Sequence, residues 1–463
     1  MTRYILLAVI VCVAGCRTEL PPSADGRKEV PMTLVNVRPF RMGQPDAVLL
    51  FTGGTGGMLE VCNCSGPMPG GLARRNGLVE SYRQSFPNTI LVDVGDAFWV
   101  APADIRNGYI LRGYAQIGYD AVTLGDQEWA AGRTRLAEML AVNKTPALST
   151  TVTSPDVGAM QVFKREFPNV KVAVVTDTTP EAFHFVPKSV TSSLLFAGPD
   201  ELNKHIADLK AQGYIVVLIA HAGEDGIEDI ASRTEADLVI RGHTTRTERK
   251  LTKVAGKPVV KIGGYEYVAA VAIKADGDKI ADIEYRPELV DTSWPIDGKL
   301  LLTYQAYAHA AMMRALDAER TTGLDYQASE SCGQCHKAQY DNWRKTRHSG
   351  AYATLVKIKR TGDPACLMCH TSGFGTKAGF YTIEKTKQLA NVNCQDCHRF
   401  NQAEHSKKGF IVEPVAKEIC QTCHTPITDP KFDLKEKQAK VRCPKSEPKA
   451  AGVPVAEADA AAN

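Results

Sequence analysis

Four short segments near the C-terminal end of the sequence combine two thiols and an imidazole at one fixed spacing. Each reads C-x-x-C-H, and together they contain Cys332, Cys335 and His336, Cys366, Cys369 and His370, Cys394, Cys397 and His398, and Cys420, Cys423 and His424. This is the attachment signature of c-type haem, in which both thiols bond to the porphyrin edge and the histidine becomes the proximal iron ligand. Paired cysteines also hold structural zinc, but zinc does not require a histidine directly after the second cysteine. The repeated histidine therefore predicts four covalently bound c-type haems.

Each such iron has a second axial position, and few residues could fill it. After residue 300, the histidines outside the motifs are His309, His348 and His405. His348 follows His336 by twelve residues, about 18 Å along a helix, so we expect it to reach a neighbouring haem. Three distal candidates for four irons leave one iron five-coordinate, unless Met312, Met313 or a lysine supplies a fourth ligand.

The residues that follow the first motif also resemble a known family. The run from Cys335 to His348 reads C-H-K-A-Q-Y-D-N-W-R-K-T-R-H. It is similar to the opening of the tetrahaem cytochrome c family typified by the electron acceptor of hydroxylamine oxidoreductase, and the resemblance covers about residues 329–425. It implies closely stacked, mostly bis-histidine haems and electron exchange with redox partner proteins. We expect a mostly helical or irregular multihaem domain over residues 326–430.

The first sixteen residues have the pattern of an export signal. Arg3 precedes an apolar run over residues 5–13 that is too short to span a bilayer, and two small residues then precede Cys16. Residues 13–16 resemble a bacterial lipobox, which implies lipidation of Cys16; an ordinary secretory signal or a core strand is the alternative. We expect a lipoprotein signal peptide over residues 1–16 and a proline-containing tether over residues 17–45. The protein would be exported and anchored by lipid in the periplasm or on the outer membrane.

Composition agrees with a folded, exported protein. The 463 residues are enough for two or three domains, and a net charge of +3 gives no indication of a nucleic-acid partner. Of thirteen cysteines, those outside the signal, the lipid site and the haem motifs are Cys62, Cys64 and Cys443. We assume no disulfide between Cys62 and Cys64, because one intervening residue would strain it.

Short apolar strands alternate with helix-like segments between residues 46 and 290 and then give way to successive strands. Strands are expected over residues 47–52, 89–94, 121–124, 215–220, 238–240, 259–262, 268–273 and 280–285, and helices over residues 72–85 and 133–142. This order predicts an α/β layered sandwich. Residues 291–325 are expected to form a linking helix, and residues 431–463 a disordered tail.

Four polar residues follow strands of this predicted sandwich. They are Asp96, Asp126, His221 and His243. Ligands gather at the carboxyl ends of strands in α/β sheets, and carboxylates combined with imidazoles suit manganese, iron or zinc. Aspartate and histidine also form turns and caps after strands, so the residue types alone leave the metal site open.

The order of these motifs resembles that of calcineurin-like metallophosphoesterases, in particular the periplasmic 5′-nucleotidase and UDP-sugar hydrolase family. The matching segments are residues 92–96, 125–128, 220–221 and 242–245. The resemblance implies a metallophosphoesterase-like domain over residues 46–290. In that family two metal ions clamp a phosphate and activate water.

The sequence departs from the family where the first of those metals would bind. Gly54 and Gly56 replace an aspartate and a histidine, Thr245 replaces the last histidine, and Gln127 replaces the histidine that protonates the leaving group. Asp126 stands in place of an asparagine. The resemblance therefore implies a degenerate domain with at most one divalent ion (Mn, Fe or Zn), held by Asp96, Asp126, His221 and His243.

Together these features predict an exported, lipid-anchored tetrahaem cytochrome that transfers electrons, with the metallophosphoesterase-like domain as a scaffold or binding module. Two alternatives stay open. One is a single-metal phosphoester hydrolase that carries a redox module. The other is a haem-based oxidoreductase that acts on a small nitrogen compound at an open iron.

Overall fold

The computed structural model describes residues 32–62, 66–100, 105–184, 186–223, 226–425, 428–429 and 431–444. The predicted signal peptide, Cys16 and the first part of the predicted tether lie outside these ranges, as does Cys64. Over the described ranges, the longest apolar helices fall short of what a membrane crossing requires.

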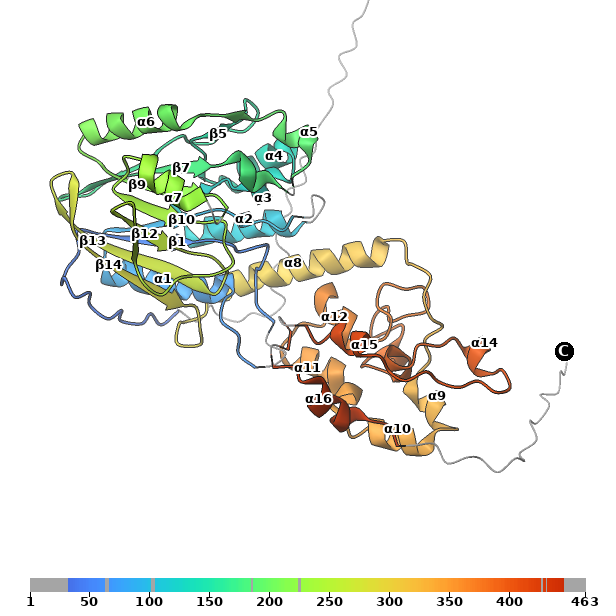
Figure 1. Cartoon of the computed structure of the whole chain (residues 1–463). Helices are drawn as coiled ribbons and strands as arrows, with labels where there is room; N and C mark the ends of the chain where they lie inside the picture. Colours follow the sequence, from blue (N-terminus) through green and yellow to red (C-terminus); the bar gives the residue numbers. More distant parts are fainter. Residues whose placement is uncertain are drawn as a thin grey trace, which may run out of the picture. The chain divides into compact units, whose positions relative to one another are not determined.

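Two six-stranded sheets form the α/β domain (Figure 1). The first has the strand order β14-β13-β1-β2-β3-β4. Its members are β1 (Ala47–Thr52), β2 (Thr89–Asp93), β3 (Ala121–Thr123), β4 (Ala147–Leu148), β13 (Tyr267–Asp276) and β14 (Lys279–Leu289). The second has the order β11-β12-β10-β9-β7-β6. Its members are β6 (Phe163–Glu166), β7 (Lys171–Thr178), β9 (Ile215–His221), β10 (Leu238–Arg241), β11 (Thr252–Val254) and β12 (Lys257–Lys261).

Alternating apolar residues give each sheet one face toward the other sheet and one face toward helices. Leu49 and Phe51 of β1 pack with Val174 of β7 and Val217 of β9 in a cluster between the sheets. On the outer face of the first sheet, apolar residues pack against α1 (Leu72–Ser85), α2 (Arg106–Ile117), α4 (Arg133–Asn143) and the first half of α8 (Gly298–Asp317). On the outer face of the second sheet they pack against α6 (Pro199–Ala211) and α7 (Gly226–Arg233). The predicted α/β layered sandwich is confirmed.

The central strands run parallel, so their carboxyl ends share one edge of each sheet. In the first sheet β1, β2, β3 and β4 are parallel neighbours, and in the second β7, β9, β10 and β12 are. Short elements complete the domain: α3 (Asp126–Trp129), α5 (Lys188–Thr191), β5 (Val152–Thr153) and β8 (Leu195–Phe196). The segments that carry Asp96, Asp126, His221 and His243 all leave the sheets at this edge.

The prediction of a tether over residues 17–45 is wrong for the last part of that range, because residues from about 35 onward pack on the domain. The Val35 and Val37 backbone N–H groups donate to the Ser81 and Ser85 hydroxyls. Phe40 is buried, with its ring centroid 5.0 Å from that of Phe86. A buried aromatic ring anchors this segment, although its sequence shows no periodicity.

Helix α8 confirms the predicted linking helix, ending at Asp317. The Asp297 side chain accepts a hydrogen bond from the Lys299 backbone and caps its N-terminus. Farther along, Tyr304 donates a hydrogen bond to Asp363 just before the second haem motif.

The region that follows contains short helices and a small apolar core. The helices are α9 (Ser329–Gly333), α10 (Lys337–Trp343), α11 (Ala351–Lys357), α12 (Pro364–His370), α13 (Cys394–Cys397), α14 (Gln402–His405), α15 (Lys417–Gln421) and α16 (Leu434–Val441). The buried apolar residues of its cluster are Leu355, Leu367, Phe380, Leu389 and Ala390. These short helices agree with the mostly helical or irregular domain that the sequence predicts over residues 326–430.

The predicted disordered tail is wrong for residues 434–441, which form α16. Asp433 caps this helix, and Glu436 pairs with Lys440 one turn later. The end of the helix is tied to α10, because Asn342 donates to the Arg442 carbonyl.

Two cysteines outside the C-x-x-C-H motifs lie in the described ranges. Cys62 is disulfide-bonded, which we did not expect, and Cys443 is an exposed thiol.

Candidate functional site

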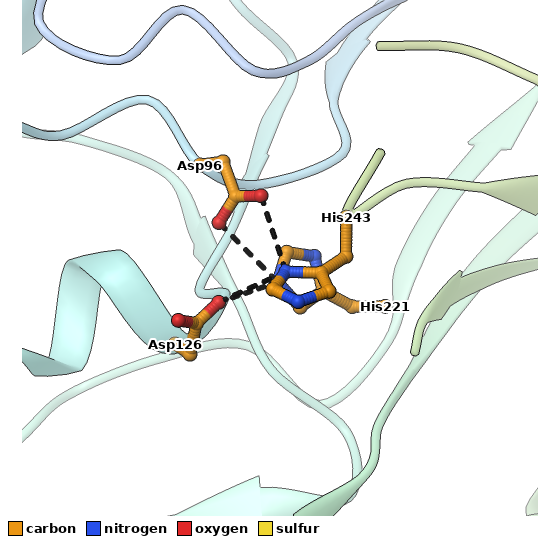
Figure 2. A group of neighbouring side chains, drawn as sticks. All are labelled: Asp96, Asp126, His221 and His243. Atoms are coloured by element: carbon orange, nitrogen blue, oxygen red, sulfur yellow. Dashed lines mark hydrogen bonds and ion pairs between the residues drawn. The ribbon is translucent and has the colours of Figure 1, made fainter. Parts of the chain in front are cut away.

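Two carboxylates and two imidazoles meet at the edge where the strands end (Figure 2). The His221 Nε2 atom lies 3.0 Å from Asp126 Oδ1 and 3.4 Å from Asp96 Oδ1. The His243 Nδ1 atom lies 3.2 Å from Asp126 Oδ1 and 3.3 Å from Asp96 Oδ2. One donor atom from each residue lies within 4.8 Å of all the others. The structure therefore brings together all four predicted ligands from four separate segments of the chain.

Unusual backbone conformations put these side chains in place. Asp96 and His243 adopt left-handed conformations, with φ of 59° and 49°, which cost energy for residues other than glycine. The backbone also approaches His221 closely: a Cβ on Gly125 would lie 2.5 Å from the His221 ring. Glycine is required there because any side chain would displace the imidazole.

Glu128, which sequence reasoning did not assign, holds the loop that carries Asp96. Its two carboxylate oxygens accept hydrogen bonds from four backbone N–H groups, those of Asp96, Ala97, Phe98 and Gly125. Glu128 is itself buried. Its position three residues after Gly125, at the start of α3, is the spacing of a helix-capping acid, and that signal could have identified it.

The electrostatics of Asp96 and of the two histidines favour their charged forms in the metal-free state. Burial alone would raise the pKa of Asp96, but His221 and His243 hold it below its usual range. Burial opposes protonation of His221, yet Asp96 and Asp126 raise its pKa well above the usual value. The Asp126 and Asp96 carboxylates beside His243 Nδ1 raise the pKa of His243 to about 9. Two buried carboxylates therefore hold two protonated imidazoles where one cation could replace both protons.

The donor set fits a single divalent ion. Ligands about 2.0–2.2 Å from one metal lie roughly 3–4 Å apart, and the four imidazole–carboxylate distances of 3.0–3.4 Å fall in this range. The His221 Nδ1 atom is 3.2 Å from the Val94 carbonyl oxygen, which leaves Nε2 directed at the carboxylates. Asp96 Oδ1 and His243 Nδ1 are buried without a well-directed hydrogen bond, so a metal would satisfy both atoms.

Two glycines stand where the resemblance to metallophosphoesterases implies ligands for another metal, so neither offers a side chain to an ion. Gly54 and Gly56 run along the Asp96 loop, and their N–H groups donate to the carbonyls of Gly95 and Asp96. Gly54 has φ of +59°, and a Cβ there would lie 2.9 Å from the Gly264 backbone. Thr245 is exposed, and Gln127 offers an amide in place of an acid. Among the described residues, the site holds ligands for one ion.

In the haem region, the thiols of different motifs meet in pairs. Within the described ranges all eight motif cysteines are unbonded thiols. The Cys332 and Cys394 thiols lie close enough to shift each other's pKa, and so do the Cys369 and Cys423 thiols. The first motif therefore lies beside the third, and the second beside the fourth.

Two of the three predicted distal histidines face a motif histidine. The His348 ring centroid lies 6.3 Å from that of His424, and the His405 centroid lies 5.8 Å from that of His336. Metal–imidazole bonds of about 2 Å on both sides of one iron would put the centroids roughly 6 Å apart, so both pairs fit an iron between them. His309 instead lines a cavity with Lys359, Arg360 and Asp363.

The methionines proposed as alternative ligands have different surroundings. Met312 packs against the apolar cluster that includes Cys366, whereas Met313 is exposed. Neither of the two pairs of facing histidines involves His370 or His398, and burial and the nearby His336 imidazole both lower the pKa of His398.

This geometry defines a chain with two parts, an α/β sandwich with a candidate single-metal site and a c-type cytochrome region. Residues 331–399 match the model of the family "Cytochrome c554 and c-prime", which spans the first three C-x-x-C-H motifs. The curated cytochrome c-554 of Nitrosomonas europaea is 34% identical over 129 residues, which cover 23% of this chain and 54% of that protein. The chain thus spans about half the length of the curated relative that it matches. The match implies c-type haem and confirms the predicted resemblance.

Solved structures are similar to the α/β part in fold. The sulfate thiohydrolase SoxB of Thermus thermophilus has a TM-score of 0.53 at 18% identity, over 66% of this chain and 69% of that one. A 5′-nucleotidase precursor from Thermus thermophilus has a TM-score of 0.51 at 17% identity, over 74% of this chain and 73% of that one. At such identities the likeness shows the fold alone, and it confirms the predicted metallophosphoesterase-like sandwich.

Proposed function

We propose that this protein transfers electrons through four c-type haems held by its C-terminal region. The match of residues 331–399 to a cytochrome family carries this proposal. The fourth C-x-x-C-H motif, at Cys420, Cys423 and His424, lies beyond that match but has the same residues and the same unbonded thiols. When bound, each haem supplies a one-electron ferric/ferrous couple. Redox proteins are the partners that such a cytochrome implies.

The facing histidines support an assignment of axial ligands. We infer that His405 opposes His336 at the first haem and that His348 opposes His424 at the fourth. Stacked aromatic rings fix two of these imidazoles: Phe400 lies 4.9 Å from His405, and Phe432 lies 4.7 Å from His424, between ring centroids. Imidazoles that are held in this way keep their orientation when the iron changes its redox state. This favours electron transfer over exchange of the iron ligands.

Rapid-mixing reduction of the full-length protein tests the proposal. All four haems are expected to be reduced by a small one-electron donor and reoxidised by an acceptor without loss of absorbance. A His348→Ala variant should keep four covalent haems but convert one low-spin iron to a high-spin iron. An unchanged spin state in this variant would contradict the assignment of His348.

We further propose that the protein is exported and anchored by lipid at Cys16, in the periplasm or on the outer membrane. The lipobox-like residues 13–16 support this, and haem attachment to thiols agrees with an exported protein. A Cys16→Ser variant should lose lipid labelling and leave the membrane fraction. Labelling that persists in this variant would contradict the anchor.

For the sandwich domain we propose a single bound divalent ion and a role as scaffold or binding module, with little phosphoester hydrolysis. The supporting observation is that donors for one ion converge while Gly54, Gly56 and Gln127 stand where hydrolysis needs ligands and an acid. Loss of one positioned acid alone removes about 10²–10⁴-fold in rate.

Hydrolysis at a single metal is the second candidate, because all four donors stay assembled and one metal-bound water could still attack a phosphate. Assays with nucleotides and an aryl phosphate, with manganese, iron or zinc, separate the two. Turnover that disappears in Asp96→Asn would favour the hydrolase and overturn the scaffold role.

A further inference from the structure

The motif histidines differ in what their second ring nitrogen meets. The His370 Nδ1 atom lies 2.7 Å from the Ala351 carbonyl oxygen, a neutral backbone acceptor. The His398 Nδ1 atom is buried without a hydrogen-bond partner in the described part of the chain. The His424 Nδ1 atom instead lies 2.8 Å from a carboxylate oxygen of Asp429. The fourth motif therefore has a negatively charged acceptor where the second has a neutral one.

The loop after His424 holds this carboxylate in place. The Asp429 backbone N–H donates to the Thr425 carbonyl at 2.8 Å. The Thr428 hydroxyl donates to the Cys423 carbonyl, inside the motif itself. The Asp429 side chain is 11% exposed, whereas that of His424 is 33% exposed. The Asp429 carboxylate is therefore mostly buried, and hydrogen bonds hold its own backbone and that of Thr428 beside the imidazole.

The rest of the surroundings of His424 keep the ring oriented. Phe432 stacks on the imidazole with 18° between the ring planes. Lys437 approaches the Asp429 carboxylate only to 3.9 Å, a weak contact at a partly exposed site. The principal partner of the carboxylate is therefore the imidazole N–H.

A carboxylate acceptor changes the imidazole as a ligand. The hydrogen bond from Nδ1–H to a charged acceptor is stronger than one to a neutral carbonyl and shifts electron density to Nε2. A more basic Nε2 and a nearby negative charge both stabilise ferric over ferrous iron, and they lower the reduction potential. By contrast, the His398 Nδ1 atom has no such carboxylate contact in the described part of the chain.

We propose that Asp429 is a positioning residue that lowers the reduction potential of the fourth haem. This inference rests on the proposed function, because it needs a haem at the fourth motif. It adds to the proposed electron transfer a residue that tunes one haem, since a lower potential makes the fourth haem a stronger reductant.

Redox titration of the full-length protein, followed by absorbance and electron paramagnetic resonance, tests the proposal. In Asp429→Asn one midpoint potential is expected to rise while the other three stay unchanged. Loss of such a partner changes metal affinity by about 10- to 100-fold. If only the ferric state loses this stabilisation, the midpoint potential of the one-electron couple should rise by roughly 60–120 mV. The matched control is Asp433→Asn, which makes the same charge change four residues away, where asparagine still caps α16.

A second variant covers the case in which Asp429→Asn does not fold. Thr428→Val keeps the carboxylate but removes the bond that ties the loop to Cys423, and it is expected to raise the same potential by a smaller amount. Mass spectrometry of each protein counts the haems. Four haems with potentials equal to those of Asp433→Asn would overturn this inference alone. A wild-type chain without the fourth haem would overturn the proposed function and this inference with it.

Discussion

Replacing Glu128 with glutamine changes one buried atom and should destabilise the sandwich domain. The carboxylate accepts from Ala97 at 2.8 Å and Phe98 at 3.1 Å through one oxygen, and from Gly125 at 2.9 Å and Asp96 at 3.3 Å through the other. A glutamine keeps one of the two oxygens and has an NH2 group in place of the other. Because each position faces two backbone N–H donors, the NH2 group meets two donors in either orientation of the amide. Two buried donors are then left unsatisfied, at about 1–3 kcal/mol each. We expect a loss of about 2–6 kcal/mol in the free energy of unfolding.

Urea denaturation of the full-length protein, followed by circular dichroism, measures this loss. The control is Glu138→Gln on α4, whose side chain is 58% exposed and pairs with Arg135 at the surface. That variant should stay within about 0.5 kcal/mol of wild type. Because Glu128 also holds the strained Asp96 backbone, metal affinity should fall in Glu128→Gln and not in the control. A Glu128→Gln protein as stable as the control would refute the reasoning.

Three further predictions concern the metal and the haems. Elemental analysis, corrected for haem iron, should find one manganese, zinc or non-haem iron per wild-type chain and none in His221→Ala, with haem content unchanged; retained metal would contradict the proposed ligands. Metal affinity should rise with pH below about pH 9, by up to tenfold per pH unit for each proton displaced, because the ion must displace protons from His243 and His221, whose pKa values are both raised. Calorimetry in buffers of different ionisation enthalpy should detect this proton release, and affinity that does not change with pH would contradict it. Electron paramagnetic resonance should show a new high-spin iron in His405→Ala but not in His309→Ala, and equal spectra would contradict the pairing of His405 with His336.

Much of the sandwich could be predicted from the sequence because its strands are apolar and sharply bounded. The strand Ala47–Thr52 and the helix Leu72–Ser85 begin and end where the pattern places them. The four candidate ligands were predictable for the same reason, since each follows a buried strand and parallel strands end at one edge. Helix α6 and strand β7 were not predicted, although their residues are amphipathic and apolar.

Contacts between distant segments could not be predicted. Glu128 reaches the Asp96 loop from about thirty residues away, and the Val94 carbonyl meets His221 across 127 residues. The packing of residues 32–45 and of α16 depends on the partners Ser81, Ser85 and Asn342, which neither segment's own sequence reveals. His309 has the residue type of a distal ligand, but the packing of α8 determines what it faces.

Intact-mass measurement combined with coulometric titration of the purified full-length protein tests the central claim most directly. The account predicts a mass increase of four covalent haem groups and a reversible uptake of four electrons per chain at the haems. A chain that carries zinc at the C-x-x-C-H motifs, or one that takes up no electrons despite bound haem, would contradict it.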